Sequence, residues 1–202
     1  MKTTKMLLPM VALLLLASCG FLYGAPATKS KAITDVSDAG WEVNEFEYTN
    51  QFGEAFGTKD LKGQYWLANM IFASCPTVCR TMTPNVISLQ EEVNKQGLDL
   101  QFVSFTVDPD FDDAVVLKKY GEAYGADFSN YHFLTGYSIE EISDFARESF
   151  KSLVQELPDS NDIMHSVNFF LVDGEGNVIR FYNGDADFDE KAIIRDLKSI
   201  MR

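Results

Sequence analysis

The hydrophobic and polar positions of this 202-residue chain change period repeatedly, which predicts strands and helices in alternation. Apolar runs of strand length, several of them apolar on both faces, occupy 65–72, 98–107, 131–134 and 167–172, and the turn 173–177 leads into a last strand at 178–182. Apolar residues recur at helical spacing over 84–97, 112–124, 138–150 and 187–201. The alternation favours one sheet with helices between its strands.

The start of the first long helix has two interpretations. Thr83 followed by Pro84 is typical of an N-cap and the first helical residue. Pro84 is also compatible with the interior of one longer helix that begins near Pro76 and is kinked by the proline. The sequence leaves both open.

Residues before the first buried strand predict a hairpin. The stretch 41–49 alternates in part, and 50–54 carries a turn signal. With the later elements, this order predicts an α/β fold: a mixed, mainly parallel central sheet flanked by helices, with an N-terminal β-hairpin. Ligands of such sheets bind at the carboxyl ends of the strands, where Cys75, Cys79 and Asp108 are all expected.

The N-terminus has the pattern of an export signal. Lys2 and Lys5 precede the apolar run 6–16, which is shorter than the roughly 20 residues a membrane-spanning helix needs. The following Leu-Ala-Ser-Cys at 16–19 resembles a bacterial lipobox, in which Cys19 becomes the lipidated N-terminus; the alternative is an ordinary signal that ends near a cysteine. We therefore predict a signal peptide at 1–18, a lipidated tether at 19–40 and a domain at 41–202. This places the domain on a bacterial cell membrane, facing the extracytoplasmic side.

Composition narrows the class of partner. A hydrophobic fraction of 46% is sufficient for one sizeable core. The formal net charge of −13 argues against nucleic acid, because phosphate binding requires clustered lysine and arginine. It fits an acidic surface that is simply solvated, or a basic partner or cation.

If Cys19 carries lipid, two of the three cysteines remain, Cys75 and Cys79. They lie four residues apart, between a strand and a helix, and four residues apart on a helical turn would place both on one face. A thiol near a helix N-terminus has a lowered pKa, and thiolate is both a nucleophile and a soft metal ligand. The pair therefore fits a redox site, a metal site or a structural disulfide.

A third ligand would favour the metal site. Of two histidines, His132 lies inside a predicted strand, where a core or surface role is expected. His165 lies at the end of a long polar connection, 151–164, whose length suggests function. Two thiolates with one imidazole suit copper, as Cu(I) or Cu(II), whereas zinc prefers a fourth ligand.

Together these motifs resemble the Sco/SenC family. The motifs are Phe-Ala-Ser-Cys-Pro-Thr-Val-Cys at 72–79, Val-Asp-Pro at 107–109 with Asp112, and a lone His165 before a strand and hairpin. The similarity extends over 46–201. It implies a thioredoxin-like fold and a copper-binding protein that assists assembly of the binuclear copper centre of cytochrome c oxidase, with an oxidase subunit as recipient.

The resemblance also implies roles for individual residues. By position, Cys75, Cys79 and His165 would be the copper ligands, and Asp108 would be the nearby acidic residue that tunes them. The alternative function is a thiol-disulfide oxidoreductase that reduces cysteines of the oxidase copper site or of other exported proteins. In that case Cys75 attacks, Cys79 resolves and a thiol reductant partner regenerates the pair. A peroxide-reducing thiol enzyme is a third hypothesis.

Three positions depart from the family pattern or from that of thioredoxin-type reductases. Arg80 stands where the family commonly has proline, and Phe111 where it often has a basic residue. The strand at 167 follows His165-Ser166, whereas a thioredoxin-type reductase has a proline there. The last difference favours metal binding over general disulfide reduction.

Overall fold

The computed structural model describes residues 32–158, 160 and 162–201. The predicted signal peptide and Cys19 lie outside these residues. Among the described residues, no helix is both long and apolar enough to cross a membrane.

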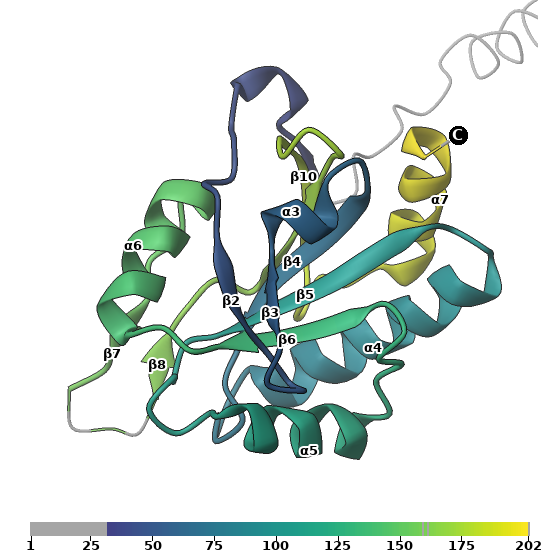
Figure 1. The fold of residues 1–202 in the computed structure, drawn as a ribbon. Helices are drawn as coiled ribbons and strands as arrows, with labels where there is room; N and C mark the ends of the chain where they lie inside the picture. The colour runs from purple at the N-terminus through teal and green to yellow at the C-terminus, as the bar shows by residue number, and fades with distance from the viewer. Residues whose placement is uncertain (1–31, 159, 161, 202) are drawn as a thin grey trace, which may run out of the picture. The chain divides into compact units, whose positions relative to one another are not determined.

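One eight-stranded mixed sheet forms the centre of the domain, with strand order β1-β10-β9-β4-β5-β6-β2-β3 (Figure 1). Strands β4, β5 and β6 pair in parallel, and the other pairings within this sheet are antiparallel. The strands are β1 (Ile33–Asp35), β2 (Glu47–Asn50), β3 (Ala55–Gly57), β4 (Tyr65–Ile71), β5 (Leu100–Thr106), β6 (Tyr131–Thr135), β9 (Asn168–Val172) and β10 (Val178–Asn183). The α/β class with a mixed sheet and an N-terminal hairpin is confirmed. The expectation that the sheet is mainly parallel is wrong, because only two of its seven strand pairings are parallel: the strands added at both edges pair antiparallel.

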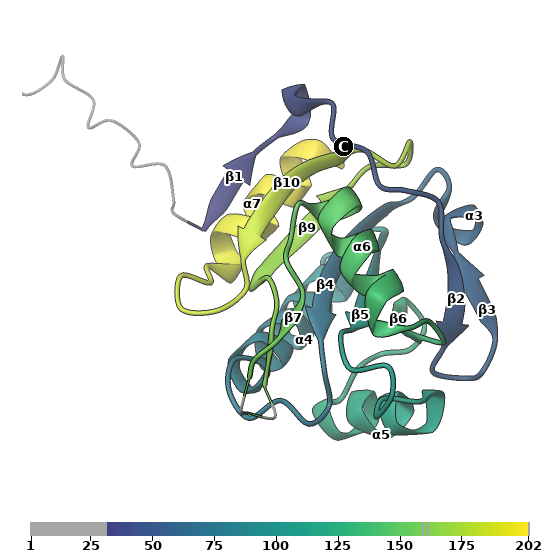
Figure 2. The same cartoon turned by 90° about the vertical axis from the view of Figure 1, so that its left-hand side faces the viewer.

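Helices cover both faces of the sheet. Helix α6 lies on one face, while α4 and α7 lie on the other, with α5 beside α4 (Figures 1 and 2). The helices are α3 (Thr58–Leu61), α4 (Cys79–Lys95), α5 (Ala114–Tyr124), α6 (Ile139–Phe150) and α7 (Glu190–Ile200), with a short 3-10 turn, η1 (Ser37–Ala39). This arrangement buries both faces of β4 and β5, which explains why these two strands have a nearly continuous apolar sequence.

Side-chain caps start three of the helices. Asp113 accepts from the Val116 amide at α5, and Asp189 accepts from the Ala192 amide at α7. Ser138 and Glu141 form a capping box at α6. The helices predicted over 112–124 and 138–150 are confirmed, and each begins close to its predicted start.

Helix α4 begins at Cys79 and contains Pro84. The prediction that Thr83 caps a helix starting at Pro84 is therefore wrong, and the longer helix is confirmed. Thr83 is fully buried, and its hydroxyl hydrogen-bonds the Tyr120 hydroxyl at 2.6 Å instead of capping. This bond fixes α4 to α5 close to the cysteines.

The domain begins earlier than residue 41. Strand β1 lies within the predicted tether and pairs antiparallel with β10. The Val36 amide donates to the Ile179 carbonyl at 3.1 Å, and Arg180 forms an ion pair with Asp35 at 2.5 Å. Three strand residues are too few to produce a readable period, so the sequence pattern does not reveal this strand.

The connection 151–164 is also more regular than predicted. It contains two short strands, β7 (Gln155–Glu156) and β8 (Ile163–Met164), which pair antiparallel as a separate two-stranded sheet. This small sheet carries His165 directly after its second strand. The long polar connection is thus the element that positions the histidine.

Candidate metal centre

The loop after β4 delivers the two cysteines to the start of α4. The Cys75 amide donates to the Phe72 carbonyl at 3.2 Å, which turns the chain as it leaves the strand. Cys79 is the first residue of the helix, so Cys75 precedes it. The expectation that both cysteines lie on a helical turn is therefore wrong, because the helix begins only at the second one.

The two sulfurs lie together even so, because Cys75 is bonded to the helix start. The Cys79 amide donates to Cys75 Sγ at 3.4 Å, satisfying a helix N-terminal N–H that has no partner within the helix. Both thiols are free and buried, with 7% of Cys75 and 2% of Cys79 exposed. Cys75 is thus the more accessible of the two.

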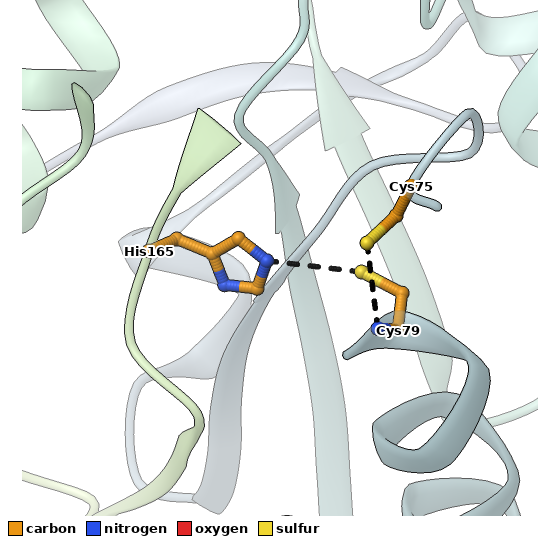
Figure 3. A group of neighbouring side chains, drawn as sticks. All are labelled: Cys75, Cys79 and His165. Carbon is orange, nitrogen blue, oxygen red and sulfur yellow. Dashed lines mark hydrogen bonds between the residues drawn. The ribbon is translucent and has the colours of Figure 1, made fainter. Parts of the chain in front are cut away.

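His165 completes a group of three potential ligands. Its Nε2 lies 3.7 Å from Cys79 Sγ, and one donor atom from each of Cys75, Cys79 and His165 lies within 4.8 Å of the others. Figure 3 shows the imidazole entering from the opposite side and pointing at the two sulfurs. The sequence-predicted ligands are therefore brought together from segments far apart in the chain.

The orientation of the imidazole suits a ligand. Its Nδ1 lies 2.9 Å from the Ser166 carbonyl oxygen, which can only accept, so Nδ1 carries the proton in that bond. The Nε2 lone pair is then free and directed at the thiols. The Phe72 ring packs against the imidazole edge to face, with centroids 5.8 Å apart, which further restricts its rotation.

The two thiols differ in acidity. Burial raises the pKa of Cys75, but hydrogen bonds to its sulfur, among them the one from the Cys79 amide, outweigh burial and lower that pKa to about 6. Burial raises the pKa of Cys79 well above its usual range, and bonding to Cys75 raises it further. Cys75 is therefore the thiolate near neutral pH, and Cys79 retains its proton.

Two aspartates near the cysteine loop have different positions. Asp108, predicted to tune the site, hydrogen-bonds the Ser74 hydroxyl at 3.3 Å, one residue before Cys75. Asp112 is fully buried and accepts from the Ala73 amide at 3.0 Å and from the Thr106 hydroxyl at 2.5 Å. Asp112 thus fixes Ala73, two residues before Cys75, to the end of β5, a contact that no sequence pattern indicates.

Comparisons with known proteins agree with this fold and site. The family model for SCO1/SenC matches residues 35–202. The chain belongs to the SCO1/SenC family.

Relatives in this family cover most of the chain. The SCO1 protein homolog of Bacillus subtilis strain 168 is 39% identical over 159 residues, covering 79% of this chain and 82% of the relative. A crystal structure of a SCO1/SenC family lipoprotein from Bacillus anthracis strain Ames is 42% identical, with a TM-score of 0.77, covering 81% of this chain and 96% of that one. BsSco, described as having a disulfide switch and as a member of the Sco family of cytochrome c oxidase assembly proteins, is 39% identical with a TM-score of 0.73, covering 79% and 93%. The predicted thioredoxin-like fold of the Sco/SenC family is therefore confirmed.

In this SCO1/SenC domain the other histidine has a different environment. His132 lies on β6, and its ring stacks on Phe56 with centroids 3.8 Å apart. Its Nδ1 is buried without a hydrogen-bond partner, and burial lowers its pKa to about 4. It lies outside the Cys–Cys–His group, in agreement with its predicted core or surface role.

Besides the bond between Asp112 and Ala73, a second hydrogen bond holds the cysteine loop in place. The Thr77 hydroxyl, between the two cysteines, donates to Asp162 Oδ2 at 3.2 Å and lies 3.8 Å from Cys75 Sγ. Asp162 precedes β8, so this bond ties the cysteine loop to the segment that carries His165. No local pattern indicates it, because the two residues are 85 positions apart.

The donor set fits copper better than zinc. Two sulfurs and one imidazole nitrogen form a soft, three-donor set, which suits Cu(I) and can also hold Cu(II). Within the described residues, no further histidine, cysteine or carboxylate joins the group as a fourth ligand, and structural zinc prefers four ligands. Since both cysteines are free, the same pair can also form a disulfide after oxidation.

Proposed function

We propose that this SCO1/SenC domain is a membrane-tethered metallochaperone that binds one copper ion and assists assembly of the binuclear copper centre of cytochrome c oxidase. The observation that supports it most directly is the convergence of Cys75, Cys79 and His165, with one donor atom from each within 4.8 Å. In this proposal the cargo is held through two thiolates and one imidazole and passed to an oxidase subunit.

Relatives support both halves of the proposal. BsSco belongs to the Sco family of cytochrome c oxidase assembly proteins and is 39% identical to this chain. A more distant member, ScoI of Arabidopsis thaliana, was crystallised with copper bound; at 24% identity and a TM-score of 0.67 its likeness concerns the fold.

The three proposed ligands differ in how ready they are to bind copper. Cys75, with a pKa of about 6, offers a thiolate near neutral pH, while Cys79 must release a proton as it binds. The His165 Nε2 already faces the sulfurs, and its Nδ1 is held by the Ser166 carbonyl. In this proposal Asp108 acts through Ser74, which precedes the first ligand.

Copper titration of the reduced protein tests the proposal. We expect wild type to bind one equivalent of Cu(II) with a sulfur-to-copper charge-transfer absorption, and His165→Ala to lose stoichiometric binding. His132→Ala is the matched control, because it removes the other histidine, which lies outside the group. Oxidation should still form the Cys75–Cys79 disulfide in His165→Ala. Unchanged copper affinity in His165→Ala would sink the proposal.

The lipid anchor forms a separate part of the proposal. The lipobox pattern at 16–19 supports cleavage before Cys19 and attachment to the outer face of a bacterial cell membrane. The related Bacillus anthracis protein is described as a lipoprotein. Metabolic labelling with a fatty acid should mark the wild type and not Cys19→Ser; equal labelling of the two would exclude lipidation at this residue.

A second candidate function is a thiol-disulfide oxidoreductase, which the unequal acidity of the two thiols favours. The Cys75 thiolate would attack a substrate disulfide, forming a mixed disulfide and releasing one thiolate. Cys79 would then attack Cys75, forming the intramolecular disulfide and releasing the second thiolate, so two electrons pass to the substrate. A thiol reductant partner would regenerate the pair.

Turnover under metal-free conditions separates the two functions. The oxidoreductase predicts catalytic reduction of a protein disulfide with a chelator present. His165→Ala should still turn over, because both sulfurs of the redox pair remain in place. Absence of turnover in wild type would leave the metallochaperone alone.

A further inference from the structure

The Cys–Cys–His group is bordered by a groove that is both apolar and acidic. A cavity of about 680 Å³ lies beside the cysteine loop and reaches Ser74, the neighbour of Cys75. Its walls come from the segment after β5 and from the β7–β8 connection. We call the docking groove the surface formed by Phe111, Leu157, Ile163, Asp108, Glu156 and Asp162.

Exposed apolar side chains are concentrated around this site. Among the described residues, six large apolar side chains are more than a third exposed, and Phe111 at 57% and Leu157 at 38% line the docking groove. Two more, Leu153 and Met164, line a cavity of about 380 Å³ that includes His165. Four of the six therefore flank the metal centre. Exposed apolar side chains gathered around one site favour an interaction surface there.

The charge of the groove indicates what the partner carries. Asp108, Glu156 and Asp162 contribute three carboxylates, and no lysine, arginine or histidine is among the described residues that line the cavity. The chain as a whole has a formal charge of −13. A surface that covers Phe111 and Leu157 must therefore bring its own cations to these carboxylates.

The groove is also connected to the ligands. Asp162 accepts from Thr77, which lies between the two cysteines, and Asp108 accepts from Ser74. The carboxylates on both walls thus hydrogen-bond the loop that carries Cys75. A protein seated in the groove lies next to the more exposed of the two thiols.

We infer that the docking groove receives the copper-accepting protein, through a lysine or arginine placed beside an aromatic or aliphatic side chain. The inference rests on the proposed function and specifies the chemistry of the recipient surface. The apolar side chain covers Phe111 and Leu157, and the cation meets Glu156 and Asp162. A second copy of this chain fits poorly, because its own groove repeats the same negative charge.

Copper transfer to a defined acceptor tests the inference. The probe is the metal-free soluble domain of the oxidase subunit that carries the binuclear copper centre. We expect Phe111→Ala and Leu157→Ala each to lower the second-order rate constant of transfer about tenfold, the scale of a central interface contact. Phe52→Ala is the matched control: Phe52 is 49% exposed and packs on Phe128, outside the groove. It should transfer at the wild-type rate.

The same assay tests the role of the carboxylates in the docking groove. Glu156→Gln should lower the rate constant several-fold and flatten its dependence on salt, since screening weakens the attraction between exposed charges. Glu175→Gln, an exposed carboxylate on the turn after β9, should leave both unchanged. Calorimetry of the two metal-free proteins should show the same ranking in Kd, which gives a readout that does not depend on copper.

The outcomes separate the inference from the function beneath it. If wild type transfers copper and the Phe111, Leu157 and Glu156 variants match it in rate and Kd, the docking groove is wrong while the metallochaperone stands. If wild type binds copper but transfers none, the proposed function and the docking groove both fall. Self-association of the free protein that Phe111→Ala abolishes, seen by sedimentation, would assign the groove to a second copy instead.

Discussion

Two aspartates hold loops at opposite ends of the sheet, in very different surroundings. Asp173 follows β9, whose last residue pairs with Trp66 near the start of β4, and Asp112 anchors the loop after the end of β4. Asp173 is half-buried, and its carboxylate accepts from the amides of Glu175 and Asn177 and from the Asn177 side chain. Both carboxylate oxygens of Asp173 therefore have hydrogen-bond partners.

Asp112 is fully buried, and one of its oxygens has no partner. Its Oδ2 accepts from Ala73 and Thr106, whereas Oδ1 is left without a hydrogen bond among the described residues. A buried, half-satisfied carboxylate is costly to the fold. The end of the sheet that carries the Cys–Cys–His group therefore accepts an unfavourable group, while the opposite end is built for stability. An unsatisfied buried group of this kind is expected close to a functional site.

The largest expected effect is a pH dependence of stability that belongs to Asp112. Burial raises the pKa of Asp112 most, hydrogen bonds from Thr106 and Ala73 lower it, and the nearby charges of Asp108 and Asp113 raise it; the net result is a pKa of about 6. A pKa raised by folding gives stability that is complete below the unfolded value and is lost as pH rises through the folded value. Between about pH 4 and pH 7, wild type should lose up to about 3 kcal/mol relative to Asp112→Asn.

Urea unfolding of the reduced, metal-free proteins across this range measures the difference, in which the other titrating groups cancel. Asp127→Asn provides a control of opposite sign. Hydrogen bonds from the amide and side chain of Ser129 lower the Asp127 pKa, so wild type should gain stability over that variant as pH rises. A difference between wild type and Asp112→Asn that stays constant with pH would show that the buried carboxylate carries no such cost.

The second expected effect is a loss of stability at the opposite end of the sheet. Asp173→Ala removes the acceptor for three donors of the turn, and we expect the free energy of unfolding to fall by about 2 kcal/mol. Copper binding should be unchanged, because the turn is remote from the ligands. Asp173→Asn, which keeps one acceptor oxygen, should lose less. Weakened copper binding in Asp173→Ala would show that the two ends of the sheet are not independent.

The sequence predicts the elements of this fold better than the contacts that tune its site. Buried strands such as β4 and β5 and the capped helix α6 have long, readable patterns, and their positions are confirmed. Strands β1, β7 and β8 have only two or three residues, so periodicity cannot reveal them. Their existence depends on neighbours that the fold supplies.

A similar limit applies to the site. Cys75, Cys79 and His165 are recognisable because few residue types can bind copper, and the structure brings them together. Asp112 and Thr77 act through hydrogen bonds to residues 39 and 85 positions away. A carboxylate or a hydroxyl in a polar segment is usually solvated, and only the folded chain shows which ones face the cysteine loop.

The smallest expected effect concerns the bond between Thr77 and Asp162, which sharpens the comparison on the site side. Thr77→Val keeps the shape of the side chain and removes the hydroxyl that donates to Asp162. Since this bond ties the cysteine loop to the segment that carries His165, its loss should let the ligands separate more readily. We expect copper release to quicken about fivefold, equivalent to about 1 kcal/mol.

Stopped-flow capture of copper by an excess of chelator measures the release rate. Thr77→Ser restores the donor and should return the rate to that of wild type, which a purely steric role of Thr77 would not produce. Thr34→Val, on the exposed edge strand β1, is the control for the substitution itself. If the valine and serine variants at position 77 release copper at one rate, the bond does not hold the ligands together. The difference between the two ends of the sheet would then rest on Asp112 alone.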